Sequence, residues 1–171
     1  MRNTRKEIGK YIGTFTARGK LSEDDSEQGR QARVRLFDGK FDTAFKVREF
    51  HAWGASTGGN TTPDVVGKLS TSPNVETGPG DFFNANDSLE IAWSQSVGSL
   101  DAGAGGGFGE SIIDPDNLVV EDLWVSVRGV SDANGVNYMI VMDKYDITET
   151  LGAVSMAKER ARDSGSEWRT P

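Results

Sequence analysis

Cysteine is absent from this sequence, and histidine occurs once, as His51. Without thiols the chain has no disulfide framework, no thiolate nucleophile and no zinc–thiolate site, and one imidazole falls short of the three or four ligands that zinc takes. A catalytic triad built on His51 would need that residue in a cleft, whereas its surroundings predict a strand. We therefore expect a partly buried strand histidine, and we predict no enzymatic activity, catalytic residue, metal or cofactor.

The sequence also lacks any apolar run of the ~18 residues that a membrane-spanning helix needs, and no early apolar segment follows its basic start. We accordingly expect no membrane span, no signal peptide, and synthesis in the cytoplasm. Excess positive charge is missing too, because the formal net charge is −7. The composition therefore argues against an overall electrostatic footprint for nucleic acid.

Basic side chains are nevertheless concentrated at the two ends of the chain. The C-terminal group is Lys158, Arg160, Arg162 and Arg169. Solvated tails are one interpretation of both groups. The other is a weak contact between nucleic acid, or an acidic partner, and the N-terminal group, which consists of Arg2, Arg5, Lys6 and Lys10.

Glycine is abundant, with 21 residues, and its densest group lies in Ser99–Ser111, SLDAGAGGGFGES. A P-loop would continue with Lys and then Ser or Thr, but Gly109 is followed by Glu110. A dinucleotide-binding loop would need a third glycine where Phe108 stands, and a helix after it. We predict a surface loop that binds no nucleotide.

Strand-like alternation dominates the rest of the chain. Asp38-Gly39 and Asn134-Gly135 each separate two runs of strand character, and both dipeptides favour the positive φ values of a tight hairpin turn. The apolar phase slips by one residue after Glu49, which is typical of a β-bulge or a bend. These features predict antiparallel strands joined by hairpins.

Three further segments indicate how strands are buried. Residues 138–142, YMIVM, are apolar at every position, so this strand should be covered on both faces. Two other segments alternate with a period of two and should each bury one face: Leu123, Val125 and Val127, and Leu89, Ile91 and Trp93.

The pattern as a whole predicts an all-β chain, namely an antiparallel β-sandwich of jelly-roll type with long loops. Thr148 can cap one short C-terminal helix from about Glu149 to Arg162. We divide the chain into a basic arm leading into the first strand (1–20), the sandwich domain (21–148), and the helix and tail (149–171).

Carboxylates are numerous, yet no motif places them in a site. Asp132 and Asn134 begin like an EF-hand loop, but the position of its bidentate Glu is Asp143, in a predicted strand. A glycosidase pair of Glu121 with Asp143 stays open, because sequence does not show the separation of the two carboxyl groups. Two sets of residues have plainer interpretations as a turn and as core aromatics: Asp114, Asp116 and Asn117, and Trp53, Trp93 and Trp124.

The segments RLFDGKFDTAFKVREFHAW, IDPDNLVVEDLWV and NYMIVMDKYDIT resemble a group of small virion-type proteins of marine bacteriophages. Over about residues 25–145 the chain is similar to a single-jelly-roll viral capsid or coat component. The resemblance implies a non-enzymatic subunit that assembles with its own copies and other capsid proteins, and that ends up in the virion. The alternative function is a carbohydrate- or receptor-binding β-sandwich module of the phage-spike or lectin kind.

Overall fold

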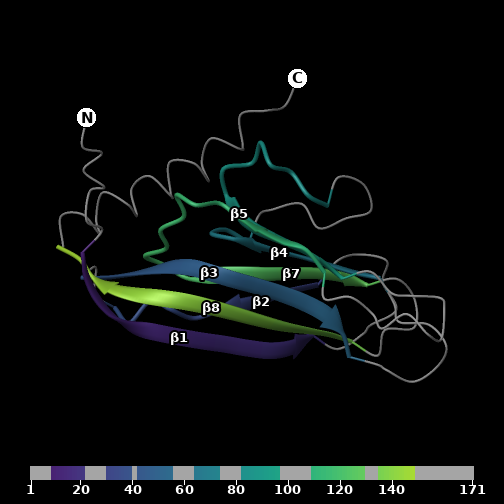
Figure 1. Ribbon diagram of the computed structural model, residues 1–171, viewed down its shortest axis with the longest axis horizontal. Helices are drawn as coiled ribbons and strands as arrows, with labels where there is room; N and C mark the ends of the chain where they lie inside the picture. Colours follow the sequence, from purple (N-terminus) through teal and green to yellow (C-terminus); the bar gives the residue numbers. More distant parts are fainter. Residues whose placement is uncertain are drawn as a thin grey trace.

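The computed structural model describes residues 9–21, 30–39, 42–55, 64–73, 82–96, 109–129 and 135–148. These residues form two antiparallel sheets that pack as a sandwich (Figure 1), which confirms the predicted fold class. The three-stranded sheet has the order β1-β8-β3 and the five-stranded sheet the order β2-β7-β4-β5-β6. The strands are β1 (Lys10–Leu21), β2 (Arg30–Val34), β3 (Thr43–Gly54), β4 (Val65–Ser70), β5 (Glu90–Ser96), β6 (Ser111–Ile113), β7 (Leu123–Gly129) and β8 (Val136–Asp146).

The strand order is consistent with the predicted jelly roll. The chain crosses between the sheets after β1, β2, β3 and β7, whereas β4 to β7 follow one another within the five-stranded sheet. The first and last strands, β1 and β8, pair along their whole length. Two sheets wound together by such crossings are what two Greek keys produce. The helix predicted at 149–162 lies outside the described residues.

The prediction of hairpins at Asp38-Gly39 and Asn134-Gly135 is wrong. Both glycines have the expected positive φ, 90° at Gly39 and 103° at Gly135. However, β2 and β3, like β7 and β8, belong to different sheets. The chain turns here to carry the apolar face of the next strand onto the opposite side of the core. A turn sequence does not specify whether the next strand pairs with the previous one in the same sheet or crosses to the other sheet.

The phase slip in β3 is a β-bulge, as predicted. Val47 lies opposite Met142 and Glu49 opposite Val141, so that Arg48 is the additional residue. Phe50, which follows the bulge, therefore joins Val47 in the core.

A second bulge corrects the predicted phase of β5. Leu69 pairs with Ala92 while Ser70 pairs with Glu90, which leaves Ile91 as the additional residue. Ile91 and Ala92 both belong to the core. Trp93 consequently lies on the outward face, not on the face of Leu89 and Ile91 as predicted.

The core between the sheets contains the alternating residues of β7 as predicted, Leu123, Val125 and Val127. On β8, Ile140 and Met142 are buried in this core, while Met139 and Val141 on the outward face are only half-buried. The two-sided burial expected for 138–142 is thus wrong, since Ile140 and Met142 are buried while Tyr138 on the same face and both residues of the outward face are half-buried. The three-stranded sheet begins at Lys10, so the sandwich starts before the predicted boundary at residue 21.

Candidate functional site

The three-stranded sheet ends in a long strand with one open side. β1 pairs with β8, and no other described strand pairs with it. At this margin the exposed fractions are 52% for Tyr11, 51% for Ile12 and 47% for Phe15. These are three of the six exposed large apolar side chains in the described part of the chain. They make the free side of β1 the first candidate for a contact surface.

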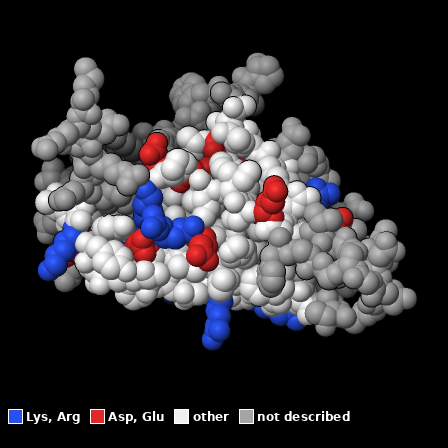
Figure 2. Space-filling view, in the orientation of Figure 1, with Lys and Arg blue, Asp and Glu red and all other residues white. Residues whose placement is uncertain are grey.

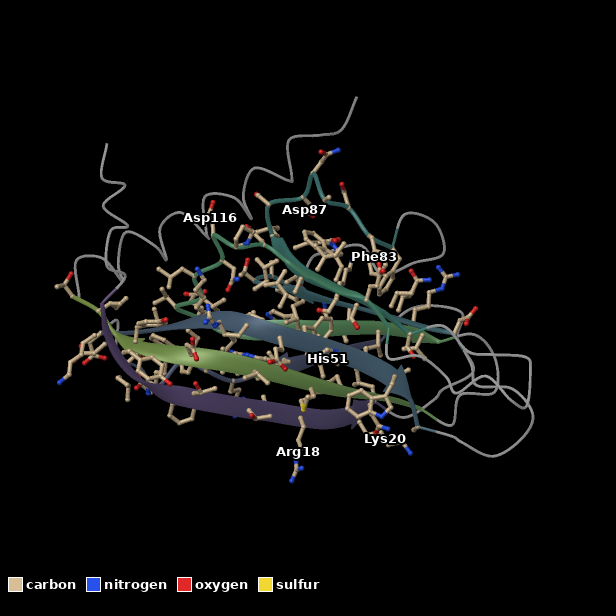
Figure 3. All side chains as sticks on the ribbon, viewed as in Figure 1. Arg18, Lys20, His51, Phe83, Asp87 and Asp116 are labelled. Carbon is tan, nitrogen blue, oxygen red and sulfur yellow. The ribbon has the colours of Figure 1, made fainter. Side chains whose placement is uncertain are left out.

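The same strand is basic. Lys10, Arg18 and Lys20 are exposed, and residues 9–21 include no acidic side chain. Figure 3 shows Arg18 and Lys20 projecting away from the sandwich. We call the surface made by Lys10, Tyr11, Ile12, Phe15, Arg18 and Lys20 the β1 edge. Of the predicted N-terminal basic group, only Lys10 lies within the described residues; Arg2, Arg5 and Lys6 lie outside them.

The five-stranded sheet ends in a short strand, β6, which pairs only with β5 among the described strands. Ile112 at its centre is 64% exposed, and Glu110, Asp114 and Asp116 flank it. Residues 82–96 and 109–116, which include β5 and β6, contain no Lys or Arg. We call the surface made by Glu110, Ile112, Asp114 and Asp116 the β6 edge.

The two edges lie at opposite ends of the sandwich. β1 packs across β2, whereas β3 packs across β4, β5 and β6, so β1 and β6 are far apart. In Figure 3, Asp116 lies on the side of the molecule away from Arg18 and Lys20. Figure 2 shows basic side chains projecting from the lower margin, where β1 runs, while acidic and basic side chains lie side by side over the middle of this face.

A buried ion pair occupies the outward face of the five-stranded sheet. The Lys68 Nζ atom lies 2.6 Å from Glu90 Oε1 and donates to the Phe82 carbonyl oxygen at 2.7 Å, and the Lys68 and Glu90 side chains are 0% and 1% exposed. Glu90 Oε2 accepts from Trp93 Nε1 at 2.6 Å and from the Asn84 amide at 2.9 Å. The pair therefore anchors residues 82–89 onto the sheet.

A second carboxylate joins the end of β2 to the start of β7. Asp122 accepts hydrogen bonds from the Leu36 amide at 2.8 Å, the Phe37 amide at 3.1 Å and Arg33 Nε at 2.6 Å. Burial alone would raise the pKa of Asp122, but the two amides and the Arg33 charge outweigh it and hold the pKa below its ordinary value of 3.8. This carboxylate is ionised and fully engaged in holding the two segments together.

The predicted turn at 114–117 is confirmed, and it carries a role that the sequence did not reveal. The Asn117 side chain accepts from the Val47 amide at 2.8 Å and donates to the Val47 carbonyl at 3.3 Å and the Asp114 carbonyl at 2.5 Å. Asn117 thus forms both hydrogen bonds that a neighbouring strand would offer to Val47. No group of three or more metal-ligating side chains occurs among the described residues.

His51 is a strand residue of β3, as predicted, and its side chain is 33% exposed. Its Nε2 atom lies 3.8 Å from Glu49 Oε2. Asp143, one half of the glycosidase pair left open, is held by Arg48 at 3.0 Å and by the Thr14 hydroxyl at 2.8 Å. Glu121, the other half, precedes β7 in the five-stranded sheet, whereas Asp143 belongs to β8 in the three-stranded sheet.

The interpretation of Trp53, Trp93 and Trp124 as core aromatics is wrong. All three are half-buried, and none belongs to the core cluster. Trp53 lies on the three-stranded sheet, while Trp93 and Trp124 lie on the five-stranded sheet on either side of β4. Their polar or cationic partners explain the outward position, because Trp93 donates to Glu90 and Arg33 lies 5.8 Å above the Trp124 ring.

One motif escaped the sequence analysis. Residues 54–58, GASTG, match the G-x-S-x-G pattern of the hydrolase nucleophile elbow. That elbow joins a strand to a helix at the top of an α/β-hydrolase sheet, whereas Gly54 ends β3 in an antiparallel sheet. Its serine, Ser56, lies outside the described residues. The strand that precedes the motif thus gives it no hydrolase context.

Most of the glycine-rich stretch Ser99–Ser111 lies outside the described residues. At its end, Gly109 packs against the backbone of Gln95 so closely that an added Cβ would overlap the Gln95 carbonyl. The Gln95 amide donates to the Glu110 carbonyl at 3.1 Å, and Ser111 already belongs to β6. This part of the stretch is therefore an entry into a strand and not free loop.

Neither a scan against protein-family models nor a search of curated proteins found a match to this chain. In the described part of the chain there is no helix long and apolar enough to cross a membrane. The candidate site of the described residues consists of two strand edges of opposite charge, each without a paired strand on one side, and of several buried polar contacts.

Proposed function

We propose that this chain is a non-enzymatic structural subunit of a virion, a capsid or coat protein that assembles with further copies of itself. The observation that carries the proposal is the β1 edge, where three large apolar side chains are about half exposed beside an unpaired strand. A long apolar edge strand is a template for pairing with another chain, and proteins that remain monomeric blunt or cover such edges. The strand order supports the proposal because capsid proteins are among the jelly rolls.

The buried ionisable side chains support a structural role. Lys68 and Glu90 anchor one segment, and Arg33 and Asp122 anchor another. Catalytic sites instead bring titratable groups together in a cleft where a substrate reaches them. Among the described residues, the buried charged pairs Lys68–Glu90 and Arg33–Asp122 hold segments of the fold together.

Light scattering and negative-stain electron microscopy of the full chain test the proposal. At low salt we expect large, regular oligomers, and we expect them to dissociate as salt rises, because contacts between exposed charges are screened. A protein that stays strictly monomeric at high concentration and low salt contradicts the assembly function.

A variant locates the contact. Ile12→Glu replaces an exposed apolar side chain of the β1 edge with an acidic one and should leave a folded monomer. His51→Glu is the matched control, because it adds the same charge to the same sheet away from β1. Equal assembly of the two variants would argue that β1 takes no part.

The second candidate is a carbohydrate- or receptor-binding module. The observation that favours it is the outward position of Trp93 and Trp124 on the same sheet, since aromatic rings serve as platforms for sugars. A monomeric protein that binds a glycan in calorimetry, and loses that binding in Trp124→Ala but not in Trp53→Ala, would favour this function over assembly.

A further inference from the structure

We propose that copies of this chain associate head to tail, with the β1 edge of one copy set against the β6 edge of the next. This inference rests on the proposed assembly function and adds which two surfaces meet. It starts from the observation that β1 and β6 each have a side on which no described strand pairs with them, at opposite ends of the sandwich and with different composition.

The charges of the two edges are complementary. The β1 edge carries three basic side chains and no acidic one, and the β6 edge carries three acidic side chains and no basic one. Figure 3 shows Arg18 and Lys20 on the opposite side of the molecule from Asp116. Two β1 edges brought together would repel each other, as would two β6 edges, because like charges at an interface cost free energy while opposite charges fix the partner and the register.

Both edges also offer apolar surface and backbone groups. Ile112 is the most exposed large apolar side chain in the described residues, and Tyr11, Ile12 and Phe15 on β1 provide a counterpart. The Glu110 carbonyl and the Asp114 amide bond toward β5, so by the alternation of an antiparallel ladder the backbone groups of Ser111 and Ile113 face the free side. A strand edge such as β1 can pair with them.

Because the contact uses two different surfaces, each copy that has bound through its β1 edge still has an unoccupied β6 edge, and the reverse. Contacts of this heterologous kind continue from copy to copy until they close into a ring or extend as a filament. A β1–β1 contact would instead be isologous and stop at a dimer. The two arrangements therefore differ in both size and response to charge.

Charge exchange between the edges tests the inference. The variant Arg18→Glu/Lys20→Glu has two acidic edges, and Glu110→Lys/Asp116→Lys has two basic edges. Each variant alone should associate at least about tenfold more weakly than the native chain. An equimolar mixture should regain the native particle size by light scattering, because every reversed edge then finds an opposite partner.

The control is Lys46→Glu/Lys144→Glu, which alters the same charge on the three-stranded sheet away from its free margin, with folding checked by circular dichroism. A native chain that assembles while the two edge variants assemble equally well overturns the head-to-tail contact and leaves the proposed function standing. Stronger assembly by the Arg18→Glu/Lys20→Glu variant alone points to β1–β1 pairing and overturns it as well. A monomeric native chain overturns both.

Discussion

At the scale of single residues, two of the three buried carboxylates in the described residues, Glu90 and Asp122, each join separate segments of the chain. Glu90 connects Lys68 of β4 to the turn at 82–89, and Asp122 connects the start of β7 to the residues after β2. Buried charges are tolerated only when they are paired and hydrogen-bonded. Both carboxylates meet that condition, so removing one partner should have a large effect.

The Lys68–Glu90 pair allows a direct measurement. Lys68→Met leaves a buried carboxylate without its cation and should lower the free energy of unfolding by about 3–5 kcal/mol. Lys68→Met/Glu90→Gln should be less destabilised, because no charge remains and the glutamine oxygen still accepts from Trp93 and Asn84. A urea denaturation cycle over the native chain, Lys68→Met, Glu90→Gln and the double variant measures the coupling, and strictly additive losses would show that the pair contributes none.

Asp122 predicts a dependence of stability on pH. Its pKa is lower in the folded chain than its ordinary value of 3.8, so the folded state favours the ionised form. The stabilisation is fully present above about pH 3.8 and is lost as the pH falls through the folded-state pKa. Asp122→Asn should be less stable than the native chain at pH 7, and the difference should shrink below pH 3.8. A difference that stays constant in urea denaturation down to pH 2 would contradict this.

At the scale of elements, the free side of β3 is closed by a segment that is not itself a strand. Phe45 and Val119 exchange backbone hydrogen bonds of 2.7 and 2.8 Å. The Asn117 side chain forms hydrogen bonds with the backbone amide and carbonyl of Val47. β3 and β1 are the two outer strands of the same sheet. In β3 this segment covers the free side, whereas no segment among the described residues pairs with the free side of β1.

Asn117→Ala should expose how much that closure contributes. It leaves the buried amide and carbonyl of Val47 without partners, and the free energy of unfolding should fall by about 1–3 kcal/mol. Hydrogen exchange of the Val47 amide should accelerate more than that of the Ile140 amide in the core strand β8. Equal protection of Val47 in both proteins would mean that Asn117 is not its effective partner.

Alternation predicted the faces of single strands but not their partners. The core positions of β7 and the bulge at Arg48 could be predicted from the sequence, because an apolar pattern or its interruption marks them. The bulge at Ile91 could not be predicted, because Leu89 and Ile91 keep an uninterrupted period of two. The burial of Lys68 could not be predicted either, since lysine is almost never fully buried and nothing in the sequence connects it with Glu90.

At the scale of the whole molecule, composition concealed the most informative feature. A net charge of −7 suggests a uniformly acidic surface, yet the β1 edge is basic and the β6 edge acidic. The predicted basic contact was placed in the first ten residues, of which Lys10 belongs to β1. Separation of charge between two ends arises only when the strands are arranged in space, so no count along the chain reveals it.

The pairing of β1 with β8 also sets an order of events during synthesis. β8 lies between β1 and β3 and is the last strand of the sandwich to be translated. Until it emerges, β1 is without the strand it pairs with. Contacts between such remote parts of a chain form slowly, because the long intervening loop is costly to close. We therefore expect the newly made chain to pass through a period in which β1 lacks its partner β8, and we expect repulsion among Lys10, Arg18 and Lys20 of neighbouring chains to oppose premature aggregation then.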